Sequence, residues 1–266
     1  MTKRVLSAIL LIVIFVPFLI IGELPFTILM TILGIMGVYE LLKVRETKKA
    51  FPIVLKIFAY LLTDYFCMYN SIAIDFINTL DYKVMAFIIF LFIIHMVFIN
   101  DTKKYNLNDG LFLIGVILFI GFSFNLVTVI RNYDITYLIY LLLITTVTDS
   151  FALFTGSLIG EHKLCPKISP KKTIEGLVGG VAMGTFVASA FYITVIHANP
   201  NIWIVIGCTL LLSLVGQLGD LVFSSIKRYY DVKDFSELIP GHGGILDRFD
   251  SLIFVSLAFI LLKGLL

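Results

Sequence analysis

The sequence predicts an all-α, polytopic integral membrane protein with about nine transmembrane helices. Hydrophobic residues make up 59% of the chain, and its mean hydropathy is +1.03. Charged residues make up only 14%, whereas soluble domains carry about 25%. Several apolar runs also approach the roughly 20 residues that a helix needs to cross about 30 Å of hydrocarbon. The nine runs lie near 5–21, 25–42, 52–69, 84–99, 110–130, 135–157, 176–197, 202–224 and 250–266.

The first and third runs are the least typical. The first follows Lys3 and Arg4, as the apolar part of a signal peptide would, but it continues as PFLIIGELPF without a small-residue cleavage site. We therefore predict a retained first span. The third run is the weakest candidate because it contains Lys56 and Asp64.

The seventh run begins GLVGGVAMG, which places Gly176, Gly180 and Gly184 four residues apart on one helix face. Small residues at this spacing allow two helix backbones to approach closely. We expect these glycines to serve packing rather than chemistry.

The basic residues predict the orientation of the spans, because cytoplasmic loops carry an excess of Lys and Arg. With a cytoplasmic N-terminus, 16 of the 20 Lys and Arg fall in the inside segments. The polar loops therefore face the cytoplasm, in a multi-pass protein of the cell membrane. Four inside lysines are expected to serve orientation only: Lys48, Lys49, Lys103 and Lys104.

The chain reads as one integral membrane domain over residues 1–266, without a linker or a soluble part. Residues 1–140 have short loops and few polar groups, and we expect them to be scaffold spans. Residues 141–251 hold the intramembrane acids and the long loops and are the expected catalytic region, and 250–266 form the last span. The three cysteines show neither metal nor disulfide spacing.

A polar stripe is expected on the eighth span. Its members follow helical steps: Ser213, Gln217, Asp220, Ser224, Lys227 and Arg228. Asp220 lies about 27 Å along this helix at 1.5 Å per residue, near its cytoplasmic end. An ionised carboxylate within a span costs roughly 2.5 to 3.5 kcal/mol, so it is rarely without a role. The role is metal or substrate binding, or an ion pair with a lysine that holds helices together.

Further acids lie near this position. Asp247 and Asp250 open the ninth span, where acids also favour the positive end of a helix dipole. Together with Asp220 they suit a hard cation such as Mg²⁺, which takes carboxylates plus phosphate oxygens. Asp149, in the sixth span, shares a small and polar helix face and is a further candidate ligand.

Two loops could hold phosphate groups. The segment PGHGG (240–244) contains Gly243 and Gly244, and glycine leaves backbone amides uncovered and tolerates positive φ. His242 in this loop would bond a phosphate or move a proton, although a bare turn would read the same way. In the loop 161–180, Thr173 is expected to cap the seventh span, whose N-terminus attracts anions. The four lysines of that loop would also satisfy the positive-inside rule without a ligand.

The stretch SSIKRYYDVKDFSELIPGHGGILDRFDS resembles the signature of the phosphatidate cytidylyltransferases, the CDP-diacylglycerol synthases. The match covers Ser224 or Ser225, Lys227, Arg228, Lys233, Asp234, Ser236, Pro240, His242, Gly243, Gly244, Asp247, Arg248 and Asp250. TDSFALFTGSLIGEHKLCPKISPKKTIEG is similar to the second characteristic stretch of the family. It departs from the pattern at Leu153-Phe154, where an aromatic residue commonly follows the alanine directly.

The resemblance implies transfer of a cytidylyl group from CTP to phosphatidate, giving CDP-diacylglycerol and pyrophosphate for phospholipid biosynthesis. It implies Mg²⁺ at the site and leaves open a monovalent cation such as K⁺ and a homodimer. The expected partners are CTP, phosphatidate and the lipid bilayer, not nucleic acid. The expected catalytic residues are Asp220, Asp247, Lys227, Arg228, Arg248 and His242. The expected phosphate-binding residues are Lys172, Ser169, Thr173, Ser224, Gly243 and Gly244. The leading metal ligands are Asp220 and Asp247, followed by Asp149 and Asp250.

Two alternatives remain at this point. A related enzyme could use CTP to phosphorylate a membrane alcohol such as a polyprenol or phytol. A transporter would also bury acids in its spans, but it usually has repeated halves and midplane sites. We find no repeat in this sequence, and the acids gather at one face of the membrane.

Overall fold

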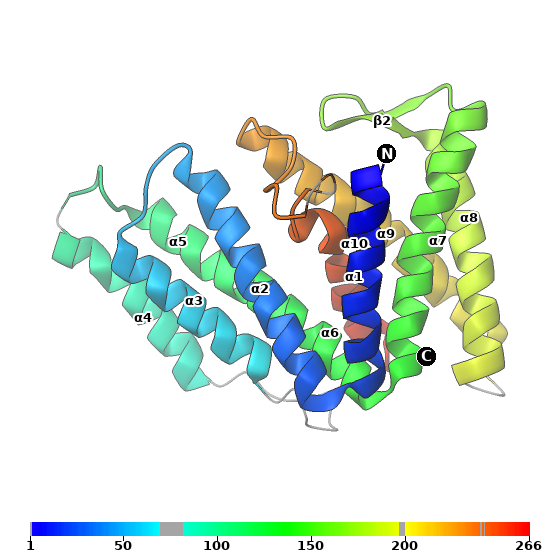
Figure 1. Cartoon of the computed structure of the whole chain (residues 1–266), viewed down its shortest axis with the longest axis horizontal. Coiled ribbons are helices and arrows are strands. Elements are labelled where there is room, and N and C mark those ends of the chain that lie inside the picture. Colours follow the sequence, from blue (N-terminus) through cyan, green and yellow to red (C-terminus); the bar gives the residue numbers. More distant parts are fainter. Residues whose placement is uncertain (1, 70–81, 100, 197–199, 240, 242) are drawn as a thin grey trace. The chain divides into compact units, whose positions relative to one another are not determined.

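The computed structural model describes residues 2–69, 82–99, 101–196, 200–239, 241 and 243–266 (Figure 1). Apart from one short hairpin, the regular structure in these residues is helical, so the predicted all-α membrane fold is confirmed. The helices lie at the nine apolar runs of the sequence, as predicted. Five of them are long and apolar enough to cross a membrane: Glu23–Glu46, Leu107–Tyr133, Ile135–Ile159, Ile174–Ile196 and Ile202–Tyr229. A crossing number of nine stays a prediction, and the helix with Lys56 and Asp64 is not among the five.

The chain forms two compact units. The first contains Met1–Asn132 and Phe235–Ile245, and the second contains Tyr133–Asp234 and Leu246–Leu266. The short segment 235–245 therefore belongs to the first unit, although the helices on both sides of it belong to the second. The predicted division at residues 140 and 250 stays a prediction.

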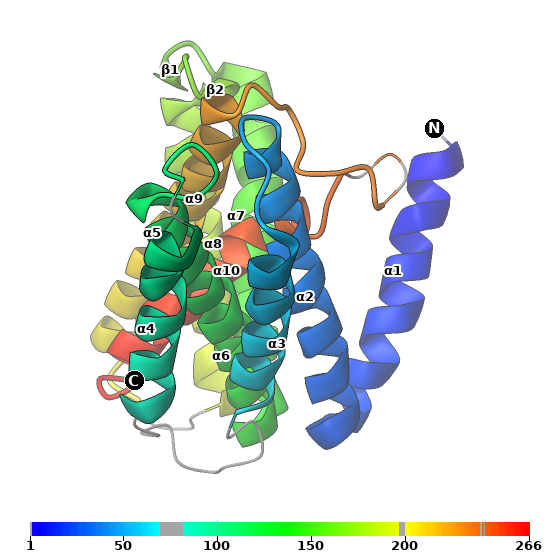
Figure 2. The same cartoon turned by 90° about the vertical axis from the view of Figure 1, so that its left-hand side faces the viewer.

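The first unit consists of helices and the 235–245 loop. The helices are α1 (Thr2–Ile21), α2 (Glu23–Glu46), α3 (Ile53–Met68), α4 (Tyr82–Ile99), α5 (Leu107–Val116) and α6 (Phe122–Tyr133). A π-helical turn, η1 (Ile117–Gly121), joins α5 and α6 into one continuous helix. Figure 2 shows α2 beside α3, against which it packs. Buried apolar side chains such as Phe26, Leu55 and Phe124 fill this unit.

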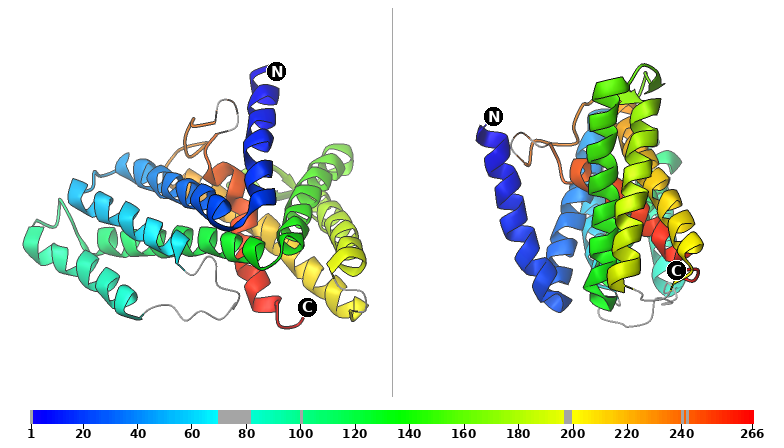
Figure 3. Two further views of the ribbon diagram at one scale, coloured as in Figure 1. Left: turned by 60° about the horizontal axis from the view of Figure 1, so that its bottom comes forward. Right: turned by 90° about the vertical axis from the view of Figure 1, so that its right-hand side faces the viewer.

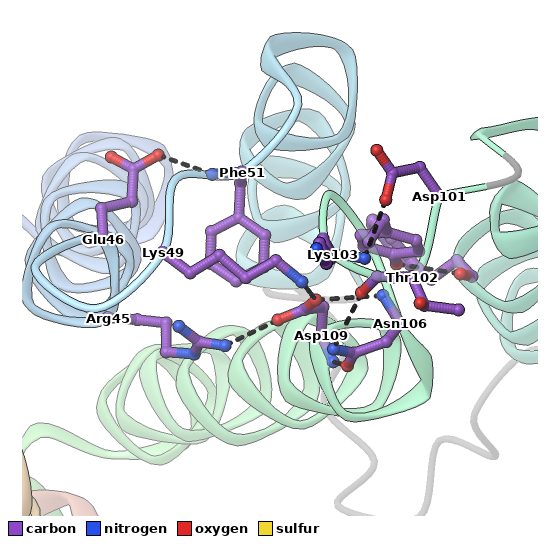
Figure 4. Close-up of polar contacts among 11 residues, drawn as sticks. Arg45, Glu46, Lys49, Phe51, Asp101, Thr102, Lys103, Asn106 and Asp109 are labelled. Atoms are coloured by element: carbon purple, nitrogen blue, oxygen red, sulfur yellow. Dashed lines mark hydrogen bonds and ion pairs between the residues drawn. The ribbon is translucent and has the colours of Figure 1, made fainter.

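A buried ion cluster fixes one end of α2 (Figure 4). The Asp109 side chain is fully buried, and its Oδ1 accepts a hydrogen bond from Arg45 at 2.6 Å. Its Oδ2 is ion-paired with Lys49 and accepts the backbone N–H of Asn106 at 3.0 Å. The expectation that Lys49 serves orientation only is therefore wrong, because its ammonium group offsets the charge of a buried carboxylate. Asp109 thus ties the C-terminal turn of α2 to the start of α5.

The second unit contains the other helices and the hairpin. Its elements are α7 (Ile135–Ile159), β1 (Lys163–Cys165), β2 (Ser169–Thr173), α8 (Ile174–Phe191), η2 (Tyr192–Ile196), α9 (Ile202–Tyr229) and α10 (Leu246–Leu262). The strands β1 and β2 pair antiparallel, with Lys163 opposite Thr173. In the unit's core, the Tyr140 hydroxyl lies 2.7 Å from that of Thr209. Outward side chains such as Trp203 (81% exposed) are apolar, as a lipid-facing surface requires.

The glycines of α8 pack as predicted. Helices α7 and α8 run side by side in the right-hand view of Figure 3. A Cβ at Gly176 would come within 2.6 Å of the carbonyl oxygen of Ala152, and one at Gly180 within 2.5 Å of that of Thr148. A larger residue at either position would force the two backbones apart.

Candidate active site

A cavity of about 550 Å³ in the second unit collects most of the predicted polar residues. It is lined by residues of α7, β1, β2, α8, α9 and α10 and of the chain just after α9. The ionisable lining residues are Asp149, Lys171, Lys172, Asp220, Lys227, Asp234, Asp247, Arg248 and Asp250. The predicted acids and bases are therefore brought together although they come from separate parts of the sequence.

Asp220 and Lys172 form an ion pair in this cavity. The Lys172 ammonium lies 2.6 Å from Oδ2 of Asp220, and the side chains are 20% and 28% exposed. Lys172 also donates to Oε1 of Gln217 at 3.2 Å, and Gln217 donates from Nε2 to Asp149 at 2.5 Å. Helix α9 places Gln217 and Asp220 three residues apart, so both reach the same wall. A chain of polar contacts thus runs from Asp149 through Gln217 and Lys172 to Asp220.

Asp247 and Lys227 form a second, more buried pair. The Lys227 ammonium lies 2.6 Å from Oδ1 of Asp247, and the side chains are 10% and 5% exposed. The two residues come from the last turn of α9 and the first turn of α10. Ser224, one turn before Lys227, donates to Oδ1 of Asp220 at 3.2 Å. Each leading metal-ligand candidate is therefore paired with a lysine, as the ion-pair alternative for Asp220 also predicted.

Asp250 lies one turn beyond Asp247 on the cavity wall. Its Oδ1 accepts the backbone N–H of Ser251 at 2.7 Å. This local bond occupies one carboxylate oxygen and leaves the position of Asp250 compatible with either capping or ligand binding.

The cavity offers hard oxygen donors, which are the kind that Mg²⁺ prefers. Within the described residues, however, no three His, Cys, Asp or Glu side chains are arranged as a ready metal site. Instead, five carboxylates face four cationic groups along the lining. The excess of acid would repel a triphosphate, and one divalent cation would more than offset it. The donor set therefore fits a metal that enters together with a polyphosphate.

The hairpin supplies two further predicted residues. Thr173 lines the cavity, and its side-chain oxygen accepts the backbone N–H of Gly176 at 3.1 Å, so the predicted cap of α8 is confirmed. Ser169 opens β2 at the other end of that strand, away from the described cavity lining.

Arg228 and Arg248 differ in position. Arg248 lines the cavity, whereas the guanidinium of Arg228 bonds two main-chain carbonyls. Its Nε donates to Ile168 at 3.3 Å and its Nη1 to Val232 at 2.8 Å. Arg228 therefore fastens the hairpin turn to the end of α9, and its predicted contact with phosphate stays a prediction.

The glycine-rich loop adopts the backbone that its sequence predicts. Gly241 and Gly243 have φ of +78° and +81°, which L side chains rarely adopt. The N–H of Ile239 donates to the carbonyl of Gly243 at 2.9 Å and closes the turn. His242 lies outside the described residues, so its predicted role rests on the sequence.

Among the charged and amide side chains of the lining, three had no assigned role in the sequence: Lys171, Gln217 and Asp234. The sequence contained a reason to consider each of them. Gln217 lies on the polar stripe, Asp234 lies within the signature, and Lys171 is next to Lys172. The sequence could not show how β2 and α9 are placed against each other, and this placement brings Lys172 to Gln217.

Comparison with known proteins gives one consistent answer. The sequence profile of the Cytidylyltransferase family matches residues 2–265. A phosphatidate cytidylyltransferase of Bacillus subtilis is 36% identical over 262 residues, covering 96% of this chain and 94% of the relative. One from Staphylococcus aureus (strain COL) is 36% identical and one from Staphylococcus haemolyticus is 34% identical, each covering 96% of both chains.

Proposed function

This chain belongs to the cytidylyltransferase family, and from that premise we infer that it joins CTP to phosphatidate. The products are CDP-diacylglycerol and pyrophosphate, for phospholipid biosynthesis. The observation that carries this inference is the meeting of signature residues from α9, α10 and the hairpin in one charged cavity. The enzyme is a multi-pass membrane nucleotidyltransferase.

In the reaction, an oxygen of the phosphatidate phosphate attacks the α-phosphorus of CTP. The new O–P bond forms as the bond between the α-phosphorus and the bridging oxygen to the β-phosphorus breaks, and that oxygen leaves with pyrophosphate. Neither step needs a covalent bond to the protein. Catalysis can therefore come from positioning and from cations placed where charge develops.

We propose that Lys172, Lys227 and Arg248 hold the phosphate oxygens. All three line the cavity. Each lysine is paired with a carboxylate at 2.6 Å, and we expect it to donate to phosphate oxygens once the triphosphate enters. Because these ion pairs already hold the ammonium groups in place, little reorganisation is needed at the moment of reaction.

We propose that Asp220 and Asp247 hold Mg²⁺, with Asp149 and Asp250 as nearby oxygen donors. When bound, the ion would neutralise the triphosphate and the departing pyrophosphate. The excess of acid along the lining supports this proposal. A monovalent cation such as K⁺ stays a prediction from the resemblance.

The site is proposed to face the cytoplasm, where CTP is present, in the cell membrane. The inside bias of Lys and Arg supports this orientation. Leu153 and Leu177 add apolar surface to the cavity wall, and Leu153 is 77% exposed. Such a wall suits a substrate whose phosphate is polar and whose remainder lies in lipid.

The position of a radioactive label tests this function. Purified protein is given phosphatidate and a polyprenol in detergent micelles with CTP labelled either at the α- or at the γ-phosphate, with and without Mg²⁺. We expect the α-label in the lipid product and the γ-label in pyrophosphate, only with Mg²⁺. Transfer of the γ-label to a lipid alcohol would instead indicate a CTP-dependent kinase, and no transfer with either label would reject the proposal.

A further inference from the structure

A fully buried carboxylate on α2 binds both ends of the glycine-rich loop. Glu40 is 0% exposed. Its Oε1 accepts the Ser236 hydroxyl at 2.6 Å and the backbone N–H of Ile245 at 2.8 Å. These donors are nine positions apart in the sequence, so a single carboxylate oxygen closes the loop 236–245.

The loop is fitted around this carboxylate. A Cβ at Gly244 would lie 2.6 Å from Cδ of Glu40, so only glycine lets the backbone pass at this distance. The Ser236 hydroxyl oxygen also accepts the backbone N–H of Leu238 at 3.3 Å, which fixes the first turn of the loop. The contacts at both ends therefore act together with the packing of the buried side chains Phe235, Ile239 and Ile245.

Helix α2 provides a fixed support for Glu40. Five and nine residues beyond Glu40, the side chains of Arg45 and Lys49 are ion-paired with buried Asp109 (Figure 4). A buried acid in an apolar helix is costly unless hydrogen bonds satisfy it. Its hydrogen bonds to Ser236 and Ile245 offset part of this cost, which indicates that holding the loop is its task.

The loop is continuous in sequence with the residues of the cavity. Asp234 and Asp247 line the cavity. Ser236 follows Asp234 by two residues, and Ile245 precedes Asp247 by two residues. The start of α10, with Asp247 and Arg248, therefore follows directly from a backbone amide that Glu40 holds.

We propose that Glu40 is a positioning residue for the cytidylyl transfer. By fixing the amide of Ile245 and the hydroxyl of Ser236, it sets the conformation of the backbone that leads into Asp247 and Arg248. This role rests on the proposed function, because Asp247 and Arg248 are the residues proposed to act on Mg²⁺ and CTP. Glu40 itself touches no substrate in this scheme, so its loss acts on nucleotide binding more than on turnover.

The test compares Glu40→Ala and Glu40→Gln with a matched control, Glu46→Gln. Glu46 lies on the same helix and is partly exposed, where it pairs with Lys56 at 2.9 Å. In Glu40→Ala we expect amide hydrogen exchange in 236–245 to rise about tenfold and KM for CTP to rise about tenfold, as loss of an anchoring hydrogen-bond acceptor predicts. The value of kcat should stay within about threefold of wild type.

Glu40→Gln keeps an oxygen that can accept from both donors, so it should restore both exchange and KM to within about threefold of wild type. Glu46→Gln should change neither. If Glu40→Ala does not fold, Ser236→Ala removes one of the two contacts and should raise exchange and KM in the same direction by a smaller factor.

Two results would overturn the proposal. One is unchanged exchange of the Ile245 amide in Glu40→Ala, or of the loop amides as a whole in Ser236→Ala, and the other is faster exchange with an unchanged KM for CTP. Because exchange is measured without substrate, failure of the anchor is distinguished from failure of the proposed function, which would appear as an inactive wild type with a protected loop.

Discussion

The ammonium group of Lys227 lies 2.6 Å from the carboxylate of Asp247, with both side chains almost fully buried. This pair joins the end of α9 to the start of α10 and contains two of the residues proposed for chemistry. The Lys172–Asp220 pair has the same length but is more exposed. The two pairs should therefore differ in what they contribute to stability.

We predict that Asp247→Asn destabilises the protein because it leaves Lys227 buried beside a neutral group. Removal of one partner of a buried pair costs roughly 3–5 kcal/mol, whereas exposed pairs contribute about 0–1 kcal/mol. Thermal unfolding in detergent should show a clearly lower midpoint for Asp247→Asn and a small change for Asp220→Asn. The double variant Lys227→Met/Asp247→Leu should regain most of the lost stability. Equal midpoints for the two single variants would contradict this.

Both acids are predicted to be needed for activity. Asp220→Asn and Asp247→Asn keep the size of the side chain but remove the charge that a hard divalent cation requires. Measured below both unfolding midpoints, each variant should lose nearly all cytidylyl transfer, with partial rescue at most by higher Mg²⁺. The matched control is Asp231→Asn, an exposed residue with φ of +57°, a conformation that Asn also adopts. Near-normal turnover of either ligand variant at limiting Mg²⁺ would reject the metal assignment.

The cavity bases should matter more than the peripheral ones. We expect Lys172→Ala and Arg248→Ala to lower kcat/KM about 10²-fold, or about 2.7 kcal/mol, because each removes a phosphate donor. Lys103→Ala, on an exposed loop, should stay within about twofold of wild type. Lys49 is unsuitable as a control because of its pair with Asp109. A similar loss at Lys103 and Lys172 would indicate that general surface charge is responsible.

The orientation is tested with topology reporters fused along the chain. Fusions after residues 49, 104, 168 and 236 should report a cytoplasmic location, and a fusion after residue 134 an external one, because Lys and Arg gather in the former segments. Cytoplasmic signal at 134 would show that the number of crossings before α7 is even rather than odd.

The length of the apolar runs was sufficient to predict the helices. The run at 25–42, for example, lies within α2 (Glu23–Glu46), whose last turn contains Arg45, the ion-pair partner of Asp109. The π-turns and the β1–β2 hairpin were not predicted. Their residues carry no pattern that separates them from a helix continuation or a loop, and their form depends on packing against neighbouring elements.

The candidate site could be predicted as a set of residues but not as a set of contacts. The polar stripe pointed to Asp220 and the signature to Lys227 and Asp247, whereas the side chain that pairs with each acid depends on how separate segments align in space. Glu40 was overlooked although an acid within an apolar run is a signal by itself. Its partners, Ser236 and Ile245, lie about 200 residues away in the sequence, and local reasoning does not reach them.

The segment Phe235–Ile245 has a consequence for cutting this protein into pieces. It belongs to the first unit but is encoded between two helices of the second, so neither unit is a contiguous stretch of the gene. A fragment that stops at Asn132 would bury Glu40 without the hydroxyl of Ser236 or the amide of Ile245. Such a half should be degraded when expressed alone and should be recovered only through complementation, when residues 133–266 are made in the same cell.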